Sequence, residues 1–192
     1  MAGIERKLTT IVVADVVGFS KLMGEDETAT LAALMACRSI IDRIIAEHHG
    51  RIFGSAGDSV LAEFPSPVQA VICAREFQQR IADRNAQGGV LPAMRFRVGI
   101  NLGDVIIEGD NLYGDGVNIA ARLEAIAEPG GVCVSSKVYE EVKRKIDIGF
   151  IDGGVRALKN IAEPIAVYHV GGARAARAVE KEKATRRPGS AG

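Results

Sequence analysis

No excess of charge and no long apolar run is present in this sequence, and both absences narrow the range of possible partners. The 24 lysines and arginines are balanced by 24 aspartates and glutamates, which leaves a formal net charge of zero. A chain without net charge has no general electrostatic attraction for nucleic acid or for an anionic membrane. None of its apolar runs approaches the ~20 residues that span a bilayer. We therefore expect neither nucleic acid nor a membrane among its partners.

Cysteine is also scarce, and its pattern argues against two common uses. Cys37, Cys73 and Cys133 are scattered and odd in number, and each has apolar neighbours. This pattern favours reduced, packed thiols over a disulfide framework, and no cysteine–histidine spacing is typical of a zinc site. The N-terminal residues contain no apolar signal-peptide core ahead of the first apolar run. Together these features predict a cytoplasmic protein.

Length and composition divide the chain into one domain and a tail. The 192 residues are enough to bury a substantial core within a single domain. Residues 1–170 hold the patterned segments and are expected to form that domain. Residues 171–192 are rich in alanine, arginine, lysine, glutamate and glycine, which predicts a linker or a disordered tail. Such a tail would suit a junction to another domain.

The first part of the patterned region predicts a strand, a helix and a hairpin. The β-branched apolar run at residues 8–14 predicts a buried strand. Apolar residues at 31–45 follow the i, i+3, i+4 spacing of a helix, and Gly50 is a natural end for it. Apolar segments at residues 51–53 and 59–64 flank a short turn, which predicts a β-hairpin.

The second part continues this alternation and completes the predicted fold class. The expected elements are a helix that begins at residues 65–67, two strands at 95–102 and 105–107 joined as a hairpin around Gly103-Asp104, a helix at 114–127, a strand at 132–134, a helix from Ser135-Ser136 to about Lys145, and further strands within 148–168. Gly99 and Gly103 are expected to serve the backbone of that hairpin. This order of strands, hairpins and helices predicts an α+β fold, a ferredoxin-like βαββαβ sandwich with helices packed on a mostly antiparallel sheet.

Two aspartates stand at positions where a sheet can hold a metal ion. Asp15 directly follows the apolar run at 11–14 and precedes a turn with Gly18, whose backbone N–H groups can face a phosphate. Asp58 lies in the predicted hairpin turn. Two carboxylates at adjacent strand ends can bridge two hard cations, which activate an attacking hydroxyl and stabilise a leaving oxygen. Each aspartate alone fits a helix cap or a turn, but the pair in these contexts favours a metal site.

A second group of candidate residues could bind phosphate. Asn118 and Arg122 are four residues apart and share one face of the predicted helix. An arginine there can neutralise charge that develops on a phosphate in the transition state, or it can be a solvated side chain paired with Glu124 or Glu128. Lys159 could reach a terminal phosphate as a point charge, although a lone lysine is more often an ordinary surface residue.

Four segments, in their order along the chain, resemble the class III adenylate/guanylate cyclase catalytic domain. They are ADVVGFS at residues 14–20, GD at 57–58, VGINLG at 98–103 and YGDGVNIAAR at 113–122. The resemblance covers roughly residues 5–170. It is strongest to the alphaproteobacterial-type soluble cyclases, in which an N-terminal cyclase domain is often followed by a helical-repeat region. The resemblance thus implies that the tail at residues 171–192 would suit the junction to a C-terminal regulatory or repeat domain that is absent from this chain.

The resemblance implies an adenylate cyclase-type phosphorus–oxygen lyase that acts in intracellular signalling. Such an enzyme converts ATP or GTP to a 3′,5′-cyclic nucleotide and pyrophosphate by in-line attack of the ribose 3′-hydroxyl on the α-phosphate. It implies a head-to-tail homodimer with active sites at the subunit interface, and two Mg²⁺ or Mn²⁺ ions. The implied residues are Asp15, Asp58 and the carbonyl of Val16 for the metals, Asn118 and Arg122 from the partner for catalysis, and Val17, Gly18, Phe19, Ser20 and Lys159 for the nucleotide phosphates.

Two positions depart from the family pattern, and both belong to the base pocket. Adenylate cyclases usually have a lysine where this chain has Gly54, and an aspartate or threonine where it has Asn111. Gly54 has no side chain to read a base, and Asn111 carries both a donor and an acceptor and so can accept either purine. We expect relaxed base selection, because strong discrimination needs buried polar readers. The residues that read guanine are also absent, so ATP is the expected substrate.

Three alternatives differ from an active cyclase. A pseudocyclase would bind nucleotide or only dimerise, without turnover, and the changes at Gly54 and Asn111 motivate it. A palm-type diguanylate cyclase would share the sheet and the two-metal logic, but its Gly-Gly-Asp/Glu-Glu-Phe signature is missing. A purely structural or interaction domain would not need both metal-site segments in the correct order.

Overall fold

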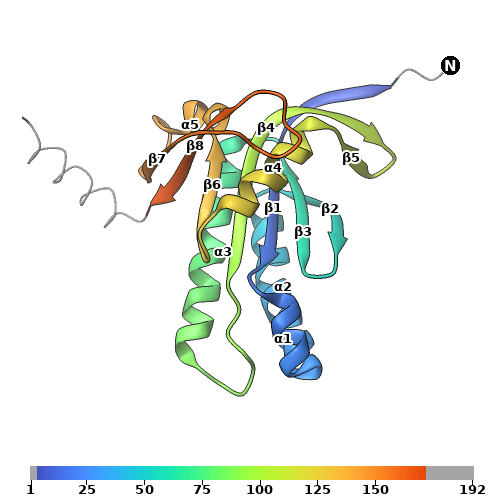
Figure 1. Ribbon diagram of the computed structural model, residues 1–192, viewed down its shortest axis with the longest axis vertical. Helices are drawn as coiled ribbons and strands as arrows, with labels where there is room; N and C mark the ends of the chain where they lie inside the picture. The colour runs from blue at the N-terminus through green and yellow to red at the C-terminus, as the bar shows by residue number, and fades with distance from the viewer. Residues whose placement is uncertain (1–3, 172–192) are drawn as a thin grey trace, which may run out of the picture.

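The computed structural model describes residues 4–171, so residues 172–192 of the predicted tail lie outside the described part. A single sheet carries helices on both of its faces (Figure 1). In chain order the elements are β1 (Glu5–Val16), α1 (Phe19–Glu25), α2 (Glu27–Glu47), β2 (Arg51–Ala56), β3 (Ser59–Phe64), α3 (Pro67–Gln87), β4 (Phe96–Glu108), β5 (Asn111–Tyr113), α4 (Asp115–Ile126), β6 (Val132–Ser135), α5 (Ser136–Val142), β7 (Gly149–Arg156) and β8 (Ile165–Gly171).

The sheet is mostly antiparallel, which confirms the predicted α+β class. Its strand order is β2-β3-β1-β4-β6-β8-β7, and β5 pairs with β4 outside this path. Strand β1 pairs antiparallel with β3 on one side and with β4 on the other. The pairing of β4 with β6 is parallel. None of the described helices is long and apolar enough to cross a membrane.

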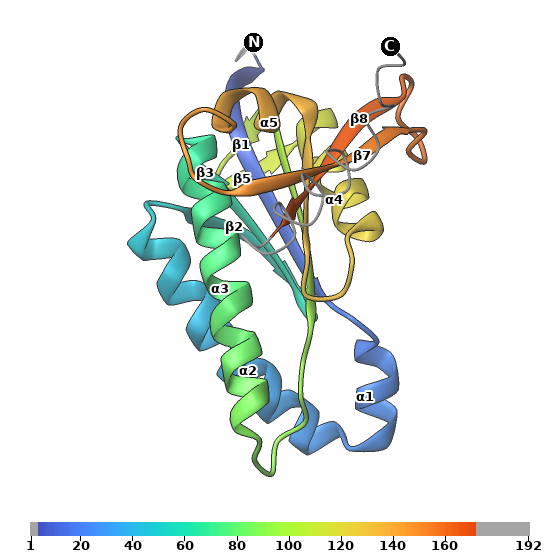
Figure 2. The same ribbon diagram turned by 90° about the vertical axis from the view of Figure 1, so that its left-hand side faces the viewer.

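The two faces of the sheet carry different helices, and β1 supplies side chains to both. Helices α2 and α3 lie on one side of the sheet and α4 on the other (Figure 2). Val12 and Ala14 pack in the larger core with α2 and α3, whereas Ile11 and Val13 pack in the smaller core under α4. This alternation follows the two-residue period of a strand, and it puts the side chain of Asp15 on the α4 face.

Most of the predicted elements are present with shifted ends. Strand β1 is longer than the predicted run at 8–14, so Asp15 lies within the strand rather than after it. The hairpin of β2 and β3 is confirmed, with Asp58 in its turn. Ser66 caps α3 by accepting a hydrogen bond from the N–H of Gln69. Helix α5 ends at Val142, earlier than the predicted position near Lys145.

The prediction of a hairpin around Gly103 and Asp104 is wrong. Strand β4 continues through both residues and pairs with β1 along its length. Gly103 is there because α4 lies close: a Cβ at this position would be 3.0 Å from the Cα of Gly116. The hairpin turn is instead at Gly109, whose φ of 60° favours glycine, and it joins β4 to β5.

The three cysteines are free thiols and are all buried, as their apolar neighbours predicted. Burial raises the pKa of Cys73 and of Cys133 to about 12. A thiol with so high a pKa is almost entirely protonated near neutral pH and is a poor nucleophile. These residues therefore contribute to packing rather than to chemistry.

Candidate active site at the end of the first strand

The structure brings the two predicted metal-binding aspartates together. Asp15 is the penultimate residue of β1, and Asp58 lies between β2 and β3. Because Ala14 pairs with Val60, the β2–β3 turn lies beside the end of β1. The backbone N–H of Val16 donates to Asp15 Oδ1 at 3.0 Å and to Asp58 Oδ2 at 3.0 Å. The two carboxylates thus converge on one donor.

This convergence has a large electrostatic consequence. Burial, the hydrogen bond to Asp58 and the negative charges of Asp58 and Glu124 raise the pKa of Asp15 to about 7, against a lowering effect of the Val16 N–H. Two carboxylates this close ionise together only at a free-energy cost. The pair therefore keeps a proton at pH values well above those at which an ordinary aspartate is ionised. A site that holds a proton for this reason is also one where a cation would relieve the repulsion.

The donor set fits a hard divalent cation. Both side chains offer carboxylate oxygens, the ligands that Mg²⁺ and Mn²⁺ prefer. Val16, whose backbone carbonyl is the third predicted ligand, directly follows Asp15 in the chain. Among residues 4–171 no group of three or more histidine, cysteine, aspartate or glutamate side chains forms a metal cage. An ion held by two carboxylates would therefore complete its shell with water and substrate oxygens, as Mg²⁺ commonly does.

Replacing Asp15 by asparagine is expected to raise the melting temperature of the metal-free protein by a few degrees at about pH 8. The pKa of Asp15 in the folded state, about 7, lies above the usual aspartate value of about 4 in the unfolded chain. The parent therefore loses stability as the pH rises from about 4 to 7. The variant lacks this penalty. The measurement is the difference in melting temperature between the two proteins from acidic to alkaline pH. A variant that melts no higher than the parent at about pH 8 would show that the carboxylate pair is not strained.

The turn after β1 has a backbone conformation that requires glycine. Gly18 has a φ of 68° and precedes α1, and a Cβ there would meet no atom, so conformation rather than space is the reason for glycine. The N–H of Val17 already donates to the Arg95 carbonyl at 2.8 Å. Phe19 and Ser20 open α1, where N–H groups have no partner within the helix. The backbone donors left for a phosphate are thus those after Val17.

Two charged residues beside the aspartates were missed by the sequence analysis. Arg97 pairs with Asp15 in the β1–β4 register, and its buried Nε has no hydrogen-bond partner within the described part of the chain. Burial raises the pKa of Glu124, with Arg97 acting against this and Asp58 adding to it. An arginine N–H is costly to bury without an acceptor, so Arg97 is suited to an anion. The available signal was the two-residue spacing from Gly99, which puts Arg97 on the face toward α4.

Gly99 explains why Glu124 comes so close to the aspartates. A Cβ at Gly99 would lie 2.2 Å from the Ala120 carbonyl oxygen and 2.2 Å from the Glu124 nitrogen. Only glycine therefore permits α4 to lie this close to β4. Like Gly103, this residue serves helix packing and not the hairpin that the sequence analysis assigned to it.

The predicted catalytic residues of α4 are not joined to the aspartates of the same chain. Val117 and Ala120 pack against the sheet, whereas Asn118 is exposed and Arg122 is half-buried. Within residues 4–171, no hydrogen bond or ion pair links Arg122 to Asp15 or Asp58, and the acidic residue of α4 that influences them is Glu124.

The remaining predicted site residues lie at three separate places. Lys159 is exposed in the loop between β7 and β8. Gly54 lies on β2 opposite Leu61, just after a register shift. Asn111 begins β5 and pairs with Glu108. The folded single chain thus holds the predicted site residues in several separate places: the aspartates at the end of β1 and in the β2–β3 turn, the exposed face of α4, the β7–β8 loop, and strands β2 and β5.

Comparison with known proteins identifies the class of protein to which this fold belongs, that of the nucleotide cyclase catalytic domains. Residues 5–167 match the family described as the adenylate and guanylate cyclase catalytic domain. The chain therefore belongs to this family. It is 45% identical over 166 residues to a Rhizobium meliloti protein named "Putative adenylate cyclase 3". The aligned region covers 86% of this chain but 28% of that relative. The chain thus spans little more than a quarter of the relative's length.

Solved structures of class III cyclases share the fold. An adenylate/guanylate cyclase/hydrolase from Silicibacter pomeroyi matches with a TM-score of 0.81 and 39% identity, covering 88% of this chain and 98% of that one. The adenylyl cyclase CyaB from P. aeruginosa matches with a TM-score of 0.78 and 26% identity, covering 90% and 97% of the two chains.

Proposed function

We propose that this domain is a metal-dependent nucleotidyl cyclase that converts ATP to a 3′,5′-cyclic nucleotide and pyrophosphate. The observation that carries the proposal is the convergence of Asp15 and Asp58 on the N–H of Val16 in a chain of the cyclase family. The ribose 3′-oxygen bonds to the α-phosphorus, the bond from that phosphorus to the β-phosphate oxygen breaks, and the hydroxyl proton passes to solvent. Two Mg²⁺ or Mn²⁺ ions would polarise the phosphate and make the hydroxyl more acidic.

The residues of the chain hold and orient the reactants. Asp15 and Asp58 supply the negative charge that binds the cations. Arg97 lies opposite Asp15, and its Nε has no hydrogen-bond partner among residues 4–171, so it is a candidate to bind the negative charge of the phosphate chain. The backbone N–H groups of Phe19 and Ser20 and the ammonium of Lys159 are further candidates. Little acid–base chemistry is required, because positioning and electrostatics supply most of the catalysis in phosphoryl transfer.

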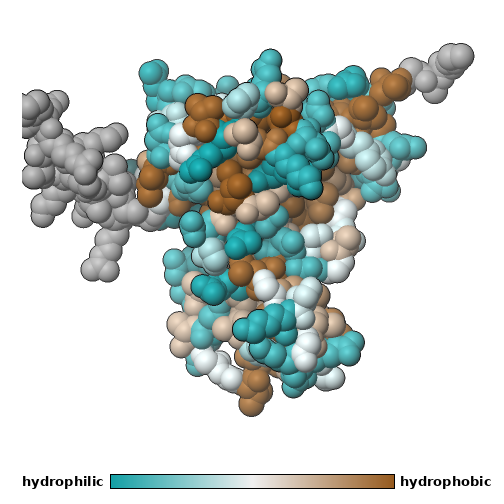
Figure 3. Space-filling model, in the orientation of Figure 1, coloured by the Kyte–Doolittle hydropathy of each residue, from teal (hydrophilic) through white to brown (hydrophobic). Residues whose placement is uncertain are grey.

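The active form is proposed to be a head-to-tail homodimer. One subunit gives the aspartates, and its partner gives Asn118 to orient the nucleotide and Arg122 to stabilise charge in the transition state. The separation of Arg122 from the aspartates within one chain supports this arrangement. The face that carries α4 shows hydrophobic residues interspersed with polar ones (Figure 3), and the exposed Tyr113 and Ile126 lie on β5 and α4. Exposed apolar surface of this kind suits contact with a second copy.

A role in intracellular signalling, in the cytoplasm, completes the proposal. Three buried thiols without a disulfide suit a reducing compartment. The short coverage of the Rhizobium relative is consistent with a catalytic domain that works beside a regulatory domain.

Product analysis tests the proposed activity. The purified protein at high concentration is incubated with ATP or GTP, with Mn²⁺ or Mg²⁺, and the products are separated by chromatography. We expect cyclic AMP that disappears in the Asp15→Ala variant. A folded protein that binds nucleotide but forms no cyclic product from either substrate would instead be a pseudocyclase.

Replacing Gly54 by lysine is expected to raise the preference for ATP over GTP about tenfold. The position has room, because a Cβ at Gly54 would lie at an ordinary 3.5 Å from the Leu61 Cβ. Its backbone is also not in the left-handed region. The measurement is the ratio of kcat/KM values for the two nucleotides, and Gly54→Met is the control for length without charge. Equal ratios in the lysine variant, the methionine variant and the parent would place Gly54 outside the base pocket.

A further inference from the structure

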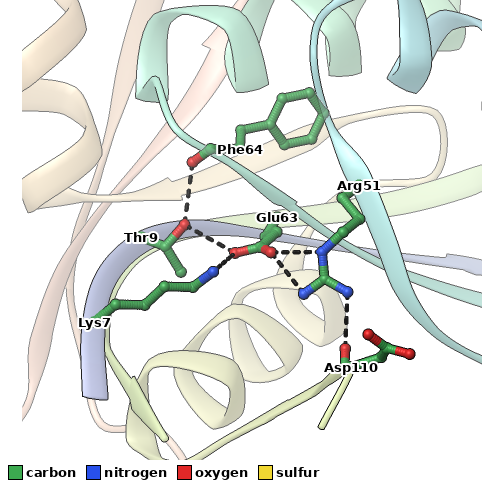
Figure 4. Close-up of polar contacts among 6 residues, drawn as sticks. All are labelled: Lys7, Thr9, Arg51, Glu63, Phe64 and Asp110. Atoms are coloured by element: carbon green, nitrogen blue, oxygen red, sulfur yellow. Dashed lines mark hydrogen bonds and ion pairs between the residues drawn. The ribbon is translucent and has the colours of Figure 1, made fainter. Parts of the chain in front are cut away.

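A buried carboxylate on β3 organises a polar cluster that the catalytic proposal does not use. Glu63 is 8% exposed and lies among Lys7, Thr9 and Arg51 (Figure 4). Lys7 Nζ is 2.7 Å from Glu63 Oε2, and Thr9 Oγ1 donates to the same oxygen at 3.3 Å. Arg51 reaches the other oxygen, Oε1, with Nε at 2.7 Å and Nη2 at 2.6 Å. Both carboxylate oxygens are therefore satisfied.

The charges in this cluster are well matched. Burial acts to raise the pKa of Glu63, but hydrogen bonds and charges from Lys7 and Arg51 outweigh it and hold that pKa below its usual value. The carboxylate therefore stays ionised near neutral pH and keeps the Arg51 guanidinium in one orientation. A guanidinium held on one edge by a carboxylate presents its other N–H groups in a defined direction.

The free edge of Arg51 binds the tip of the β4–β5 hairpin. Arg51 Nη1 donates to the Asp110 carbonyl oxygen at 2.8 Å (Figure 4). Asp110 lies in the two-residue turn closed by the pair Glu108–Asn111. Strand β5 has three residues and pairs with β4 alone. A two-stranded hairpin this short is marginal by itself, so contacts with the body of the protein determine where its tip lies.

The two ends of this contact are next to the two base-pocket positions. On one side, Gly54 follows Arg51 by three residues on β2. On the other side, Asn111 directly follows Asp110. Because Gly54 has no side chain, Asn111 is the side chain left to read the base, and its position depends on the hairpin tip.

We propose that Arg51 is a positioning residue for base selection, which ties β2 to the β4–β5 hairpin and thereby sets the place of Asn111 relative to Gly54. The inference rests on the proposed function, because it concerns the base pocket of that same site. Arg51 itself does not touch the nucleotide. It acts through the Asp110 carbonyl, and Glu63 orients it for this contact.

The test compares two cations that share Glu63. Arg51→Lys keeps a positive charge near Glu63, but an ammonium cannot span both the carboxylate and the Asp110 carbonyl as the fork does. Lys7→Met is the matched control, because it removes one of the positive charges paired with Glu63 and leaves the contact between Arg51 and Asp110 in place. If the charge on Glu63 were what mattered, Lys7→Met would have the larger effect.

Hydrogen exchange of the nucleotide-free protein reads the tether without any turnover. In Arg51→Lys, the amides of residues 106–113 are expected to exchange about tenfold faster, and in Lys7→Met to remain at the parent rate. Parent-like exchange in a folded Arg51→Lys protein would overturn the proposal. If Arg51→Lys does not fold, the double variant Arg51→Gln/Glu63→Gln, which removes both charges together, replaces it. The exchange of residues 106–113 is then judged in the same way.

Nucleotide selection is the second measurement. The measured quantity is kcat/KM for ATP divided by kcat/KM for GTP. In Arg51→Lys this ratio is expected to fall about threefold toward one, because the KM values change, and in Lys7→Met it is expected to equal that of the parent. Faster exchange with an unchanged ratio would mean that Arg51 holds the hairpin but does not determine selection, and would overturn the proposal. If the parent makes no cyclic nucleotide, the proposed function fails, and the ratio of ATP to GTP binding constants, measured by calorimetry, decides the role of Arg51 by the same rule.

Discussion

Asp58→Ala is expected to lower the rate of cyclic nucleotide formation by about a thousandfold or more. The variant retains Asp15, but a single carboxylate cannot bridge two cations, so both activation of the hydroxyl and stabilisation of the leaving oxygen are lost. Turnover is measured by chromatography of the products at saturating Mn²⁺, where weaker binding of one ion is compensated as far as possible.

The fold should survive this substitution. Asp58 lies in a turn beside another carboxylate, and its negative charge is one of the causes that raise the pKa of Asp15. Removing it relieves repulsion, so the thermal stability of the metal-free protein should not fall. Asp83→Ala, which changes an exposed aspartate of α3, is the control and should turn over at the parent rate. Full turnover by a folded Asp58→Ala protein would show that the carboxylate pair is not the reaction centre.

Mixing two inactive variants should restore activity if the site lies between subunits. Asp58→Ala and Arg122→Ala each damage both sites of a homodimer, and Arg122→Ala alone is expected to cost about a hundredfold or more. In a mixed dimer, the Arg122→Ala subunit supplies both aspartates and the Asp58→Ala subunit supplies Arg122. One of the two sites is then intact.

The expected recovery is about a quarter of the parent activity, because random pairing makes about half of the dimers mixed and each has one working site. The variants are co-expressed with different tags, and total turnover is compared with that of each alone. Asp58→Ala mixed with Asp15→Ala is the control and should stay inactive, since both changes damage the same half of the site. No recovery in a confirmed dimer of Asp58→Ala with Arg122→Ala would contradict a shared site.

Local patterns were sufficient to predict where the two aspartates stand. An apolar run of β-branched residues followed by Asp15 and a glycine predicts a strand and its end, because strand propensity and turn chemistry act over a few residues. The same holds for the β2–β3 turn at Asp58 and for the start of α3 at Ser66. These features depend on neighbours in the sequence, and the structure has them at or within a few residues of the predicted positions.

The sequence predictions were wrong at two glycines, because a glycine can either form a turn or allow another backbone segment to pack closely against it. Gly103 and Gly99 were both assigned to a hairpin, but they lie within β4 under α4, where a Cβ would strike the helix backbone. Gly109, with a φ of 60°, makes the actual turn. Which of the two uses applies depends on a helix that packs from elsewhere in the chain, and no local pattern contains that information.

The class of the fold, the two aspartates near the end of the first strand and the departures at Gly54 and Asn111 can all be read from the amino-acid sequence. Which charges surround these positions depends on how distant segments pack together. The register of β1 with β4 puts Arg97 opposite Asp15, and the contact between Arg51 and Asp110 joins residues 59 positions apart. Periodicity states which face a side chain occupies, whereas strand register and helix packing, which depend on contacts distant in sequence, determine what it meets there.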